Sequence, residues 1–138
     1  MSVVFDTKIA VILRQDLATW QKLNVTAFTV SGIAASVDDV TGEPYRDGSG
    51  NVYLPMFRQP VLVFEADAAR IRTAYERVLS RNVPCAIFTE ELFTTNNDSD
   101  NRAAVAAVTA DDLRLMGLAL RAERVVADKN LKGLSLHR

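Results

Sequence analysis

The chain has 138 residues, and we expect residues 1–138 to form one domain with a core large enough to need no metal or disulfide. Its 16 basic and 17 acidic residues give a formal net charge of −1, which excludes a general electrostatic attraction to nucleic acid or membranes. The composition is that of a globular protein, with 49% hydrophobic residues, and the single cysteine excludes an intramolecular disulfide.

The first two predicted elements are a buried strand over residues 7–13 and a helix from residue 17 to about residue 36. The strand is a run of β-branched and apolar residues that is typical of burial on both faces. We expect Asp16 or Thr19 to cap the helix. Apolar residues recur in the helix at spacings of three and four, and they predict its buried face: Trp20, Leu23, Ala27, Val30 and Ala34.

The middle of the chain predicts a hairpin and a strand–helix–strand unit. Residues 41–60 hold three of the four prolines and three of the six glycines, so they read as a surface hairpin or loop. A second strand covers residues 61–66, and Asp67 caps the next helix. The apolar face of this helix is predicted to contain Ile71, Ala74, Tyr75, Val78 and Leu79. A turn and a third strand over residues 82–88 complete a right-handed βαβ unit with parallel strands.

The remaining residues predict two short helices and two strands. A helix over residues 102–109 follows a polar segment and is expected to be capped by Asp98, Ser99 or Asp100. Residues 113–122 form a fourth strand with Gly117 as its weak point. The segments ERVVADKNL and GLSLHR predict a last short helix and a final strand. The fold class is therefore α/β, with a three-layer α/β/α sandwich around a mixed, mostly parallel sheet of four to five strands.

Several kinds of chemistry are excluded by residue content. The only histidine is His137, and a penultimate residue is a poor member of a Ser-His-Asp or Cys-His arrangement. Zinc sites need several Cys and His ligands, and neither glycine-rich nucleotide motif is present. We expect no metal, no cofactor and an inert buried thiol at Cys85. With no apolar run long enough for a bilayer and no signal-peptide pattern, we expect a cytoplasmic protein without membrane partners.

Charged side chains follow the ends of two predicted strands, where ligands collect in open α/β sheets. If the first and third strands are parallel neighbours, one rim collects five polar residues: Arg14, Asp16, Lys22, Glu90 and Thr94. One interpretation is a hydrolytic site, in which a carboxylate activates water, an ammonium stabilises an oxyanion and a hydroxyl orients the substrate. The alternative is a structural ion network of Arg14, Asp16 and Glu90.

Short motifs along the chain carry a family resemblance. The first strand is followed by Arg14-Gln15-Asp16-Leu17 and Lys22, the third by Glu90 and Thr94, and the end contains Asp128-Lys129. In these features the chain resembles the peptidyl-tRNA hydrolase II superfamily of archaea and eukaryotes, specifically a divergent branch of small bacterial proteins of the DUF2000 type. The resemblance implies a peptidyl-tRNA hydrolase II-like fold, with Lys22, Glu90 and Thr94 as catalytic residues. We expect Arg14, Asp16 and Trp20 to bind substrate at the same rim.

The chain departs from that superfamily where substrate is bound. The family's Gly-Lys-Gly-Lys stretch is replaced by residues 19–22, and its Asp-Ala-Gly turn has lost the Ala and Gly. We therefore do not expect peptidyl-tRNA hydrolysis, and tRNA is not favoured as a partner. The expected function is a hydrolase or transferase acting on an acyl ester or small ligand at the rim. The alternative is a non-catalytic domain that binds a small ligand or a protein. The helical faces are apolar enough for a homodimer, the commonest assembly.

Overall fold

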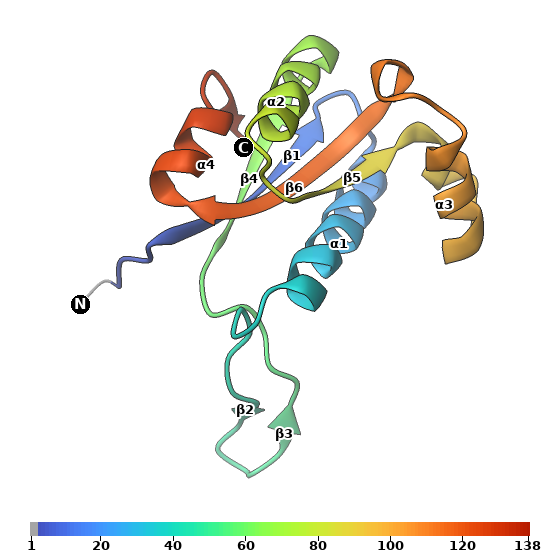
Figure 1. Ribbon diagram of the computed structural model, residues 1–138. Helices are drawn as coiled ribbons and strands as arrows, with labels where there is room; N and C mark the ends of the chain where they lie inside the picture. Colours follow the sequence, from blue (N-terminus) through green and yellow to red (C-terminus); the bar gives the residue numbers. More distant parts are fainter. Residues whose placement is uncertain (1–2) are drawn as a thin grey trace.

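The computed structural model describes residues 3–138, so the first two residues of the predicted domain lie outside it (Figure 1). Its strands and helices form a mixed α/β fold, which confirms the predicted class at that level. In chain order the elements are β1 (Thr7–Arg14), α1 (Thr19–Ser36), β2 (Tyr45–Arg46), β3 (Val52–Tyr53), β4 (Val61–Ala66), α2 (Ala68–Ser80), β5 (Cys85–Thr89), the 3₁₀ turn η1 (Glu90–Phe93), α3 (Asp98–Ala106), the 3₁₀ turn η2 (Ala110–Asp112), β6 (Leu115–Glu123), α4 (Arg124–Asn130) and β7 (Ser135–Leu136).

The main sheet has five strands in the order β5-β6-β1-β4-β7. Only β1 and β4 pair in parallel, whereas β6 runs antiparallel to both β1 and β5, and β7 runs antiparallel to β4. The expectation of a mostly parallel sheet is therefore wrong. The physical reason is that β6 returns between β1 and β5 and pairs with both. The strands β1, β4 and β5 do point the same way, but β4 and β5 are not neighbours.

Helices cover both faces of this sheet, with α2 and α4 on one side and α1 on the other (Figure 1). The side chains of β1 alternate between the two faces. Ala10 and Ile12 pack in the cluster that contains α2 and α4 residues, whereas Ile9 and Val11 pack with α1 residues. All four are completely buried. Burial on both faces explains why this strand reads as an uninterrupted apolar run.

Helix α1 buries a different face from the predicted one. Its buried residues are Val25, Thr29 and Ile33, whereas the side chains of Trp20 and Leu23 are more than half exposed. The helix carries apolar residues almost all round, so their spacing could not identify the packed face. Thr29 is tolerated there because its hydroxyl donates a hydrogen bond to the carbonyl oxygen of Val25 at 2.8 Å.

The predicted capping residue of α1 is also wrong. The N-cap residue is Ala18, which makes no side-chain cap, and neither Asp16 nor Thr19 has that role. Instead Gln21 reaches back, and its side-chain oxygen accepts a hydrogen bond from the Ala18 amide at 2.9 Å. Asp16 is held by Arg14 and is not available to the helix. The first turn of α1 therefore keeps amide groups without a side-chain acceptor.

Helix α2 follows its sequence pattern closely. Asp67 caps it by accepting a hydrogen bond from the Arg70 amide at 2.8 Å, as predicted. Its buried residues are Ile71, Ala74, Tyr75 and Val78. Leu79, predicted on the same face, is half exposed because it lies at the edge of the apolar stripe in the last turn. In α3 the cap is Asn97, which accepts from the Asp100 amide, in place of Asp98, Ser99 or Asp100.

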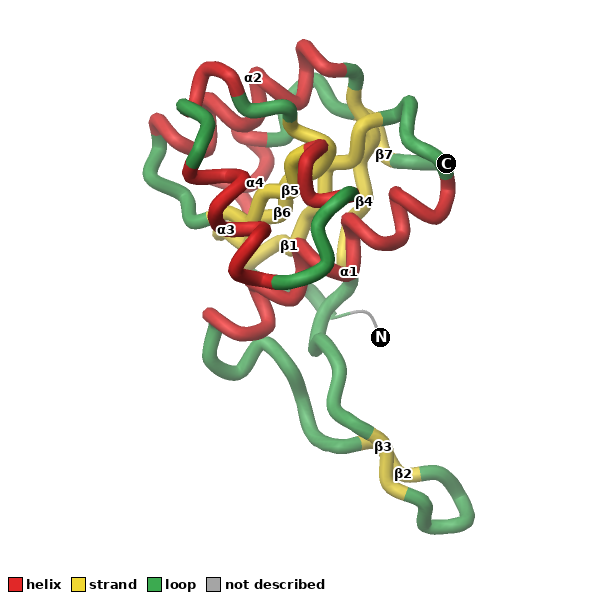
Figure 2. The backbone as a smooth tube through the Cα atoms, turned by 90° about the vertical axis from the view of Figure 1, so that its right-hand side faces the viewer, coloured by secondary structure: helices red, strands yellow, loops and turns green. Residues whose placement is uncertain are grey.

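Residues 41–58 form a hairpin arm that extends away from the sheet (Figure 2). Asp47 organises its turn, because the two carboxylate oxygens accept hydrogen bonds from the amides of Ser49 and Asn51, the Asn51 side chain and the Tyr53 hydroxyl. These bonds hold the pKa of Asp47 down at about 2. Gly50 has a φ of +89°, a conformation that favours glycine. The hairpin prediction is confirmed.

None of the helices that residues 3–138 form is long and apolar enough to cross a membrane.

Candidate functional site

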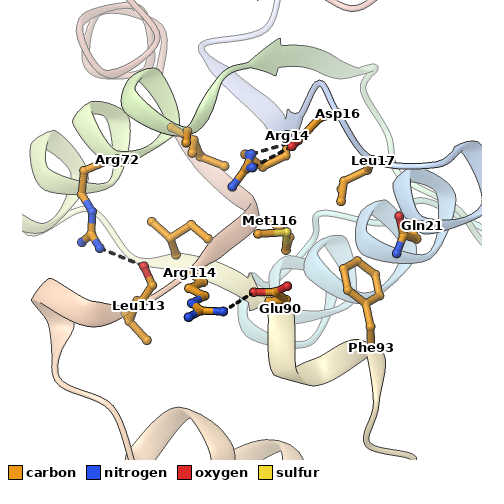
Figure 3. A pocket seen from close by; sticks show the side chains of 13 residues that line it. Arg14, Asp16, Leu17, Gln21, Arg72, Glu90, Phe93, Leu113, Arg114 and Met116 are labelled. Carbon is orange, nitrogen blue, oxygen red and sulfur yellow. Dashed lines mark hydrogen bonds and ion pairs between the residues drawn. The ribbon is translucent and has the colours of Figure 1, made fainter.

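A cavity of about 550 Å³ opens at the edge of the sheet where β1 and β5 end and β6 begins (Figure 3). The antiparallel direction of β6 brings its first residues to the last residues of its two neighbours. The first turns of α1 and α2 flank the same edge. The lining consists of Arg14, Asp16, Leu17, Gln21, Ala68, Ile71, Arg72, Glu90, Phe93, Leu113, Arg114, Leu115 and Met116.

An arginine–aspartate pair forms one wall. The Arg14 guanidinium donates from Nε to Asp16 Oδ1 at 3.0 Å and from Nη2 to Oδ2 at 2.8 Å. This paired geometry, with added attraction from Lys22, lowers the pKa of Asp16. The Arg14 side chain is 20% exposed and the Asp16 side chain 61% exposed, so the pair points its carboxylate towards solvent.

A second pair, Glu90 with Arg114, stands at the mouth of the cavity. Glu90 begins η1 directly after β5, and Arg114 directly precedes β6. The Arg114 guanidinium donates to Glu90 Oε2 at 3.0 Å, and the Glu90 amide donates to the Arg114 carbonyl at 3.0 Å. The carboxylate raises the pKa of Arg114. Both side chains are more than half exposed, so water screens the pair and a ligand can reach either group.

Arg72 supplies a third guanidinium from the second turn of α2. It donates to the carbonyl oxygens of Ala110, Asp111 and Leu113 at distances between 2.8 and 3.0 Å. Figure 3 shows the bond to Leu113. Among residues 3–138 no carboxylate lies within ion-pair distance of it. Arg72 therefore fastens the segment before β6 to α2, and no acidic side chain neutralises its charge.

The floor of the cavity is apolar. Ile71 and Met116 contribute to it, and Phe93 lies beside it from η1. The Phe93 ring packs on Phe88 at a centroid distance of 4.8 Å and meets the edge of Trp20 at 5.9 Å. These contacts fix the orientation of Phe93. The cavity therefore combines charged groups at its mouth with apolar surface below, which is typical of small-molecule sites.

The electrostatic balance of the lining is positive. Three arginines face two carboxylates, Asp16 and Glu90. The positive end of α1 adds to this charge, because Gln21 lies in its first turn and no acidic side chain caps it, whereas the Asp67 carboxylate caps α2. An anionic group is the ligand chemistry that fits this arrangement.

Three of the predicted rim residues meet at the cavity, namely Arg14, Asp16 and Glu90. The premise that the first and third strands are neighbours is wrong, because β6 lies between β1 and β5. The residues still share one edge because β1 and β5 point the same way. Trp20 lies behind Phe93, outside the lining. Thr94 donates its hydroxyl to the Glu91 carbonyl at 2.9 Å and also lies outside the lining.

Lys22 lies in a different cluster. Its Nζ is 3.0 Å from Nε2 of His137, and Oε2 of Glu65 is 3.8 Å from the same imidazole nitrogen. Lys22 does not line the cavity. Of the three residues proposed for catalysis, Lys22, Glu90 and Thr94, the structure therefore brings only Glu90 to the cavity wall.

Sequence reasoning missed Arg72 and Arg114. Arg114 is the second residue of the fourth predicted strand (residues 113–122) and directly precedes the observed β6. It would have been found at this rim only if that strand had been recognised as antiparallel. Arg72 stands five residues after the capping Asp67, which places it near the start of a helix that begins at the same rim. Cys85 is partly buried, and burial raises the pKa of its thiol. Within residues 3–138, no three His, Cys, Asp or Glu side chains gather as metal ligands.

Comparison with known proteins gives a family and a similar structure. The profile of a family described as "Protein of unknown function (DUF2000)" matches residues 7–138. The solved structure of Atu0240 from Agrobacterium tumefaciens strain C58, described as a protein of unknown function, is 49% identical in sequence, with a TM-score of 0.95. That match covers 98% of this chain and 100% of the other. No curated protein matches the chain.

Proposed function

Because the chain belongs to the DUF2000 family, whose function is unknown, we propose a role from the cavity itself: the protein binds a small anionic molecule there. The observation that carries the proposal is the charge of the lining, in which three arginines face two carboxylates. The cavity of about 550 Å³ lies within the usual range for small-molecule sites, roughly 300–1,000 Å³. The N-terminus of α1, which no acidic side chain caps, favours a negative charge at the same place.

The apolar floor of the cavity indicates which kind of anionic ligand fits. Its anionic group, a carboxylate or a phosphate, lies at the mouth, where Arg72 and Arg114 can donate hydrogen bonds. An apolar or aromatic part then covers Met116 and Phe93, whose ring offers a rigid packing surface. The ligand class is thus a small organic acid or phosphate ester with an apolar portion.

Hydrolysis or transfer of an acyl ester in the same cavity is a second candidate. It is favoured by Glu90, a solvent-accessible carboxylate at the cavity mouth beside a guanidinium. Glu90 would accept a proton from water as the water oxygen attacks the ester carbonyl, and Arg114 would stabilise the resulting oxyanion. When the acyl–oxygen bond breaks, Glu90 would return the proton to the departing alkoxide, which leaves as the alcohol. The resemblance to the peptidyl-tRNA hydrolase II superfamily supports a role for Glu90. Lys22 and Thr94 lie outside the lining, so Arg114 is the cation that this candidate uses.

Calorimetric titration with phenyl phosphate and with benzoate tests the binding proposal. We expect Arg114→Gln to weaken binding of both anions, because it removes a positive charge. We expect Glu90→Gln to tighten binding, because it removes a negative charge from the same mouth. Arg102→Gln is the matched control, since Arg102 also forms an exposed pair, with Asp98 on α3, but does not line the cavity. No binding of either anion to the wild-type protein would contradict the proposal.

The Glu90→Gln variant also separates binding from catalysis. If the protein hydrolyses esters, this variant loses turnover of p-nitrophenyl acetate while it retains or improves its affinity for phenyl phosphate. A wild-type protein with no turnover above the buffer background removes the second candidate and leaves the binding proposal intact. Turnover that survives in Glu90→Gln excludes Glu90 as the base.

A further inference from the structure

The hairpin arm of residues 41–58 carries apolar side chains that its own body does not cover. Tyr45, Val52, Tyr53, Leu54 and Met56 are between 48% and 83% exposed. Figures 1 and 2 both show the arm reaching away from the sheet and helices. A two-stranded hairpin is at best marginally stable in water without further packing. Several large apolar side chains exposed on one short hairpin are a feature of interaction sites.

A separate apolar groove of about 380 Å³ lies on the body, between the end of α1 and the start of β5. Ile33, Val37, Pro84 and Ala86 line it, together with Arg121 from β6. The Nε atom of Arg121 is buried and has no hydrogen-bond partner among residues 3–138. The negative end of α1 offsets part of this charge, but it supplies no acceptor for Nε. Among residues 3–138 no carboxylate lies within ion-pair distance of Arg121, so the groove presents an unneutralised guanidinium beside its apolar lining.

The groove and the arm meet at the end of α1. Val37, the C-cap of α1, lines the groove, and Val40 forms the base of the arm, where its carbonyl accepts a hydrogen bond from the Arg58 amide at 3.0 Å. The arm begins a few residues after Val37 and runs away from the sheet and helices (Figure 2). In a dimer with two-fold symmetry, the arm of each copy can lie in the groove of the other, so the same contact forms twice.

We propose that the occupant of this groove is the arm of a second copy of the chain, exchanged between the two copies. The apolar arm matches the apolar groove, and the arm also supplies a carboxylate for Arg121. That carboxylate is Glu43, which is exposed and forms no hydrogen bond or ion pair among residues 3–138. Asp47 is not available because the turn of the arm uses both of its oxygens.

The size of the surface also fits a second copy. A stable interface contains about 20–30 residues a side, and the arm together with the groove residues comes to about that number. A two-fold exchange would bury both surfaces on each copy. None of the groove or arm residues lines the cavity beside Glu90, so the dimer proposal and the anion-binding proposal can fail independently.

The test is the oligomeric state of the full chain, measured by sedimentation equilibrium across micromolar concentrations. We expect a dimer for the wild-type protein. Leu54→Lys and Met56→Lys should each raise the dimer dissociation constant by at least about tenfold, because each places a charge in the buried interface. Leu79→Lys is the matched control: Leu79 is half exposed on α2, outside the arm and groove, and its replacement should leave the dimer intact.

Exchanging the charges of Glu43 and Arg121 tests whether these two residues meet when the arm of one copy lies in the groove of the other. Glu43→Arg and Arg121→Glu should each weaken the dimer, and the double variant should recover most of the lost affinity. A monomeric wild-type protein overturns the proposal, and so does a dimer that the arm and groove variants leave unchanged. The alternative occupant of the groove is a small carboxylate with an apolar tail, and titration with octanoate tests it. If the wild-type protein is monomeric and binds octanoate, and Arg121→Glu abolishes that binding, the groove belongs to such a ligand.

Discussion

The ammonium of Lys22 lies 3.0 Å from Nε2 of His137, which joins the start of α1 to the penultimate residue of the chain. The backbone of His137 is held in place, because its amide donates a hydrogen bond to the Val63 carbonyl at 2.8 Å, next to the pairing of β7 with β4. Glu65 reaches the same imidazole at 3.8 Å. Lys22 thus ties α1 to the edge of the sheet, and this contact is distinct from the cavity that Glu90 lines.

Replacing Lys22 by Met should therefore act on stability more than on the cavity. We expect the free energy of unfolding to fall by about 1 kcal/mol, the usual net value of a partly buried hydrogen bond. We expect the affinity for phenyl phosphate to change little, because Lys22 does not line the cavity. Urea unfolding and calorimetric titration measure the two effects separately.

The same variant decides whether Lys22 has a catalytic role. An oxyanion donor is worth roughly 10²–10³ in turnover, so a loss of that size at unchanged stability would show that Lys22 acts on substrate. His137→Gln is the partner variant. If the two residues act only as a tie, the double variant should cost less stability than the sum of the single variants.

Gly117 is required because β6 passes directly beneath α1. A Cβ atom at this position would overlap Cγ1 of Val25, a residue that is completely buried. We expect Gly117→Ala to lower the free energy of unfolding by about 1–3 kcal/mol, the usual cost of overpacking. Chemical denaturation followed by circular dichroism measures the change.

Gly48→Ala is the control for that experiment. No atom lies within 4 Å of a Cβ at Gly48, which stands in the turn of the arm, so its replacement should leave stability nearly unchanged. Val25→Ala in the Gly117→Ala background should relieve the overlap and make the two changes non-additive. Equal effects of the two glycine variants would contradict this account of the contact between α1 and β6.

The turn of the hairpin arm should be sensitive to acid. The pKa of Asp47 is lowered from its ordinary value of 3.8 to about 2 by hydrogen bonds from Asn51, Tyr53 and Ser49. Since the folded pKa is the lower one, the stabilisation is fully present above pH 3.8 and is lost as the pH falls through about 2. An NMR titration of the Asp47 carboxyl should show this low midpoint.

Asp47→Asn serves as the control, because it keeps one side-chain oxygen as acceptor but removes the charge. In this variant the amide signals of Ser49 and Asn51 should no longer shift between pH 4 and pH 2. A midpoint near 3.8 in the wild-type protein would mean that the turn does not hold the carboxylate as the structure describes.

Local pattern identified most strands and helices, but it could not identify which strands pair. The apolar run of β1 marks a strand buried on both faces, and the single apolar stripe of α2 marks its packed face. In α1, by contrast, Trp20 and Leu23 compete with Val25 and Ile33 as the apolar face, and only the contact with β6 decides between them. Choices that depend on a distant partner are not encoded in a local window.

The same limit applies to the candidate site. Arg14, Asp16 and Glu90 follow strand ends, so the rule that ligands collect there was enough to bring them together. Arg114 stands before a strand, and it reaches the same rim only because β6 is antiparallel. Lys22 can contact His137 only because β7 pairs with β4 and brings the end of the chain beside α1. The strand β7 has only two residues, which is too short for its pairing to be read from sequence periodicity.

Variants of Arg72 can separate two effects of its guanidinium: the hydrogen bonds that hold the backbone before β6, and the positive charge that attracts a ligand. It donates to the carbonyl oxygens of Ala110, Asp111 and Leu113, and so holds the segment that leads into Arg114. A lysine keeps the charge but cannot span three acceptors with one ammonium group. We therefore expect Arg72→Lys to lower the free energy of unfolding by about 1–2 kcal/mol while much of the affinity for phenyl phosphate remains.

Arg72→Gln should instead lose both stability and affinity, because it removes the charge that no carboxylate neutralises. Arg77→Lys is the matched control from the same helix: Arg77 donates a single hydrogen bond, to the Lys132 carbonyl at 2.8 Å, and lies outside the cavity. It should cost less stability than Arg72→Lys and leave phenyl phosphate binding unchanged. If Arg72→Gln binds phenyl phosphate as tightly as the wild-type protein, the charge of Arg72 does not attract the ligand, and Arg14 and Arg114 must account for the affinity.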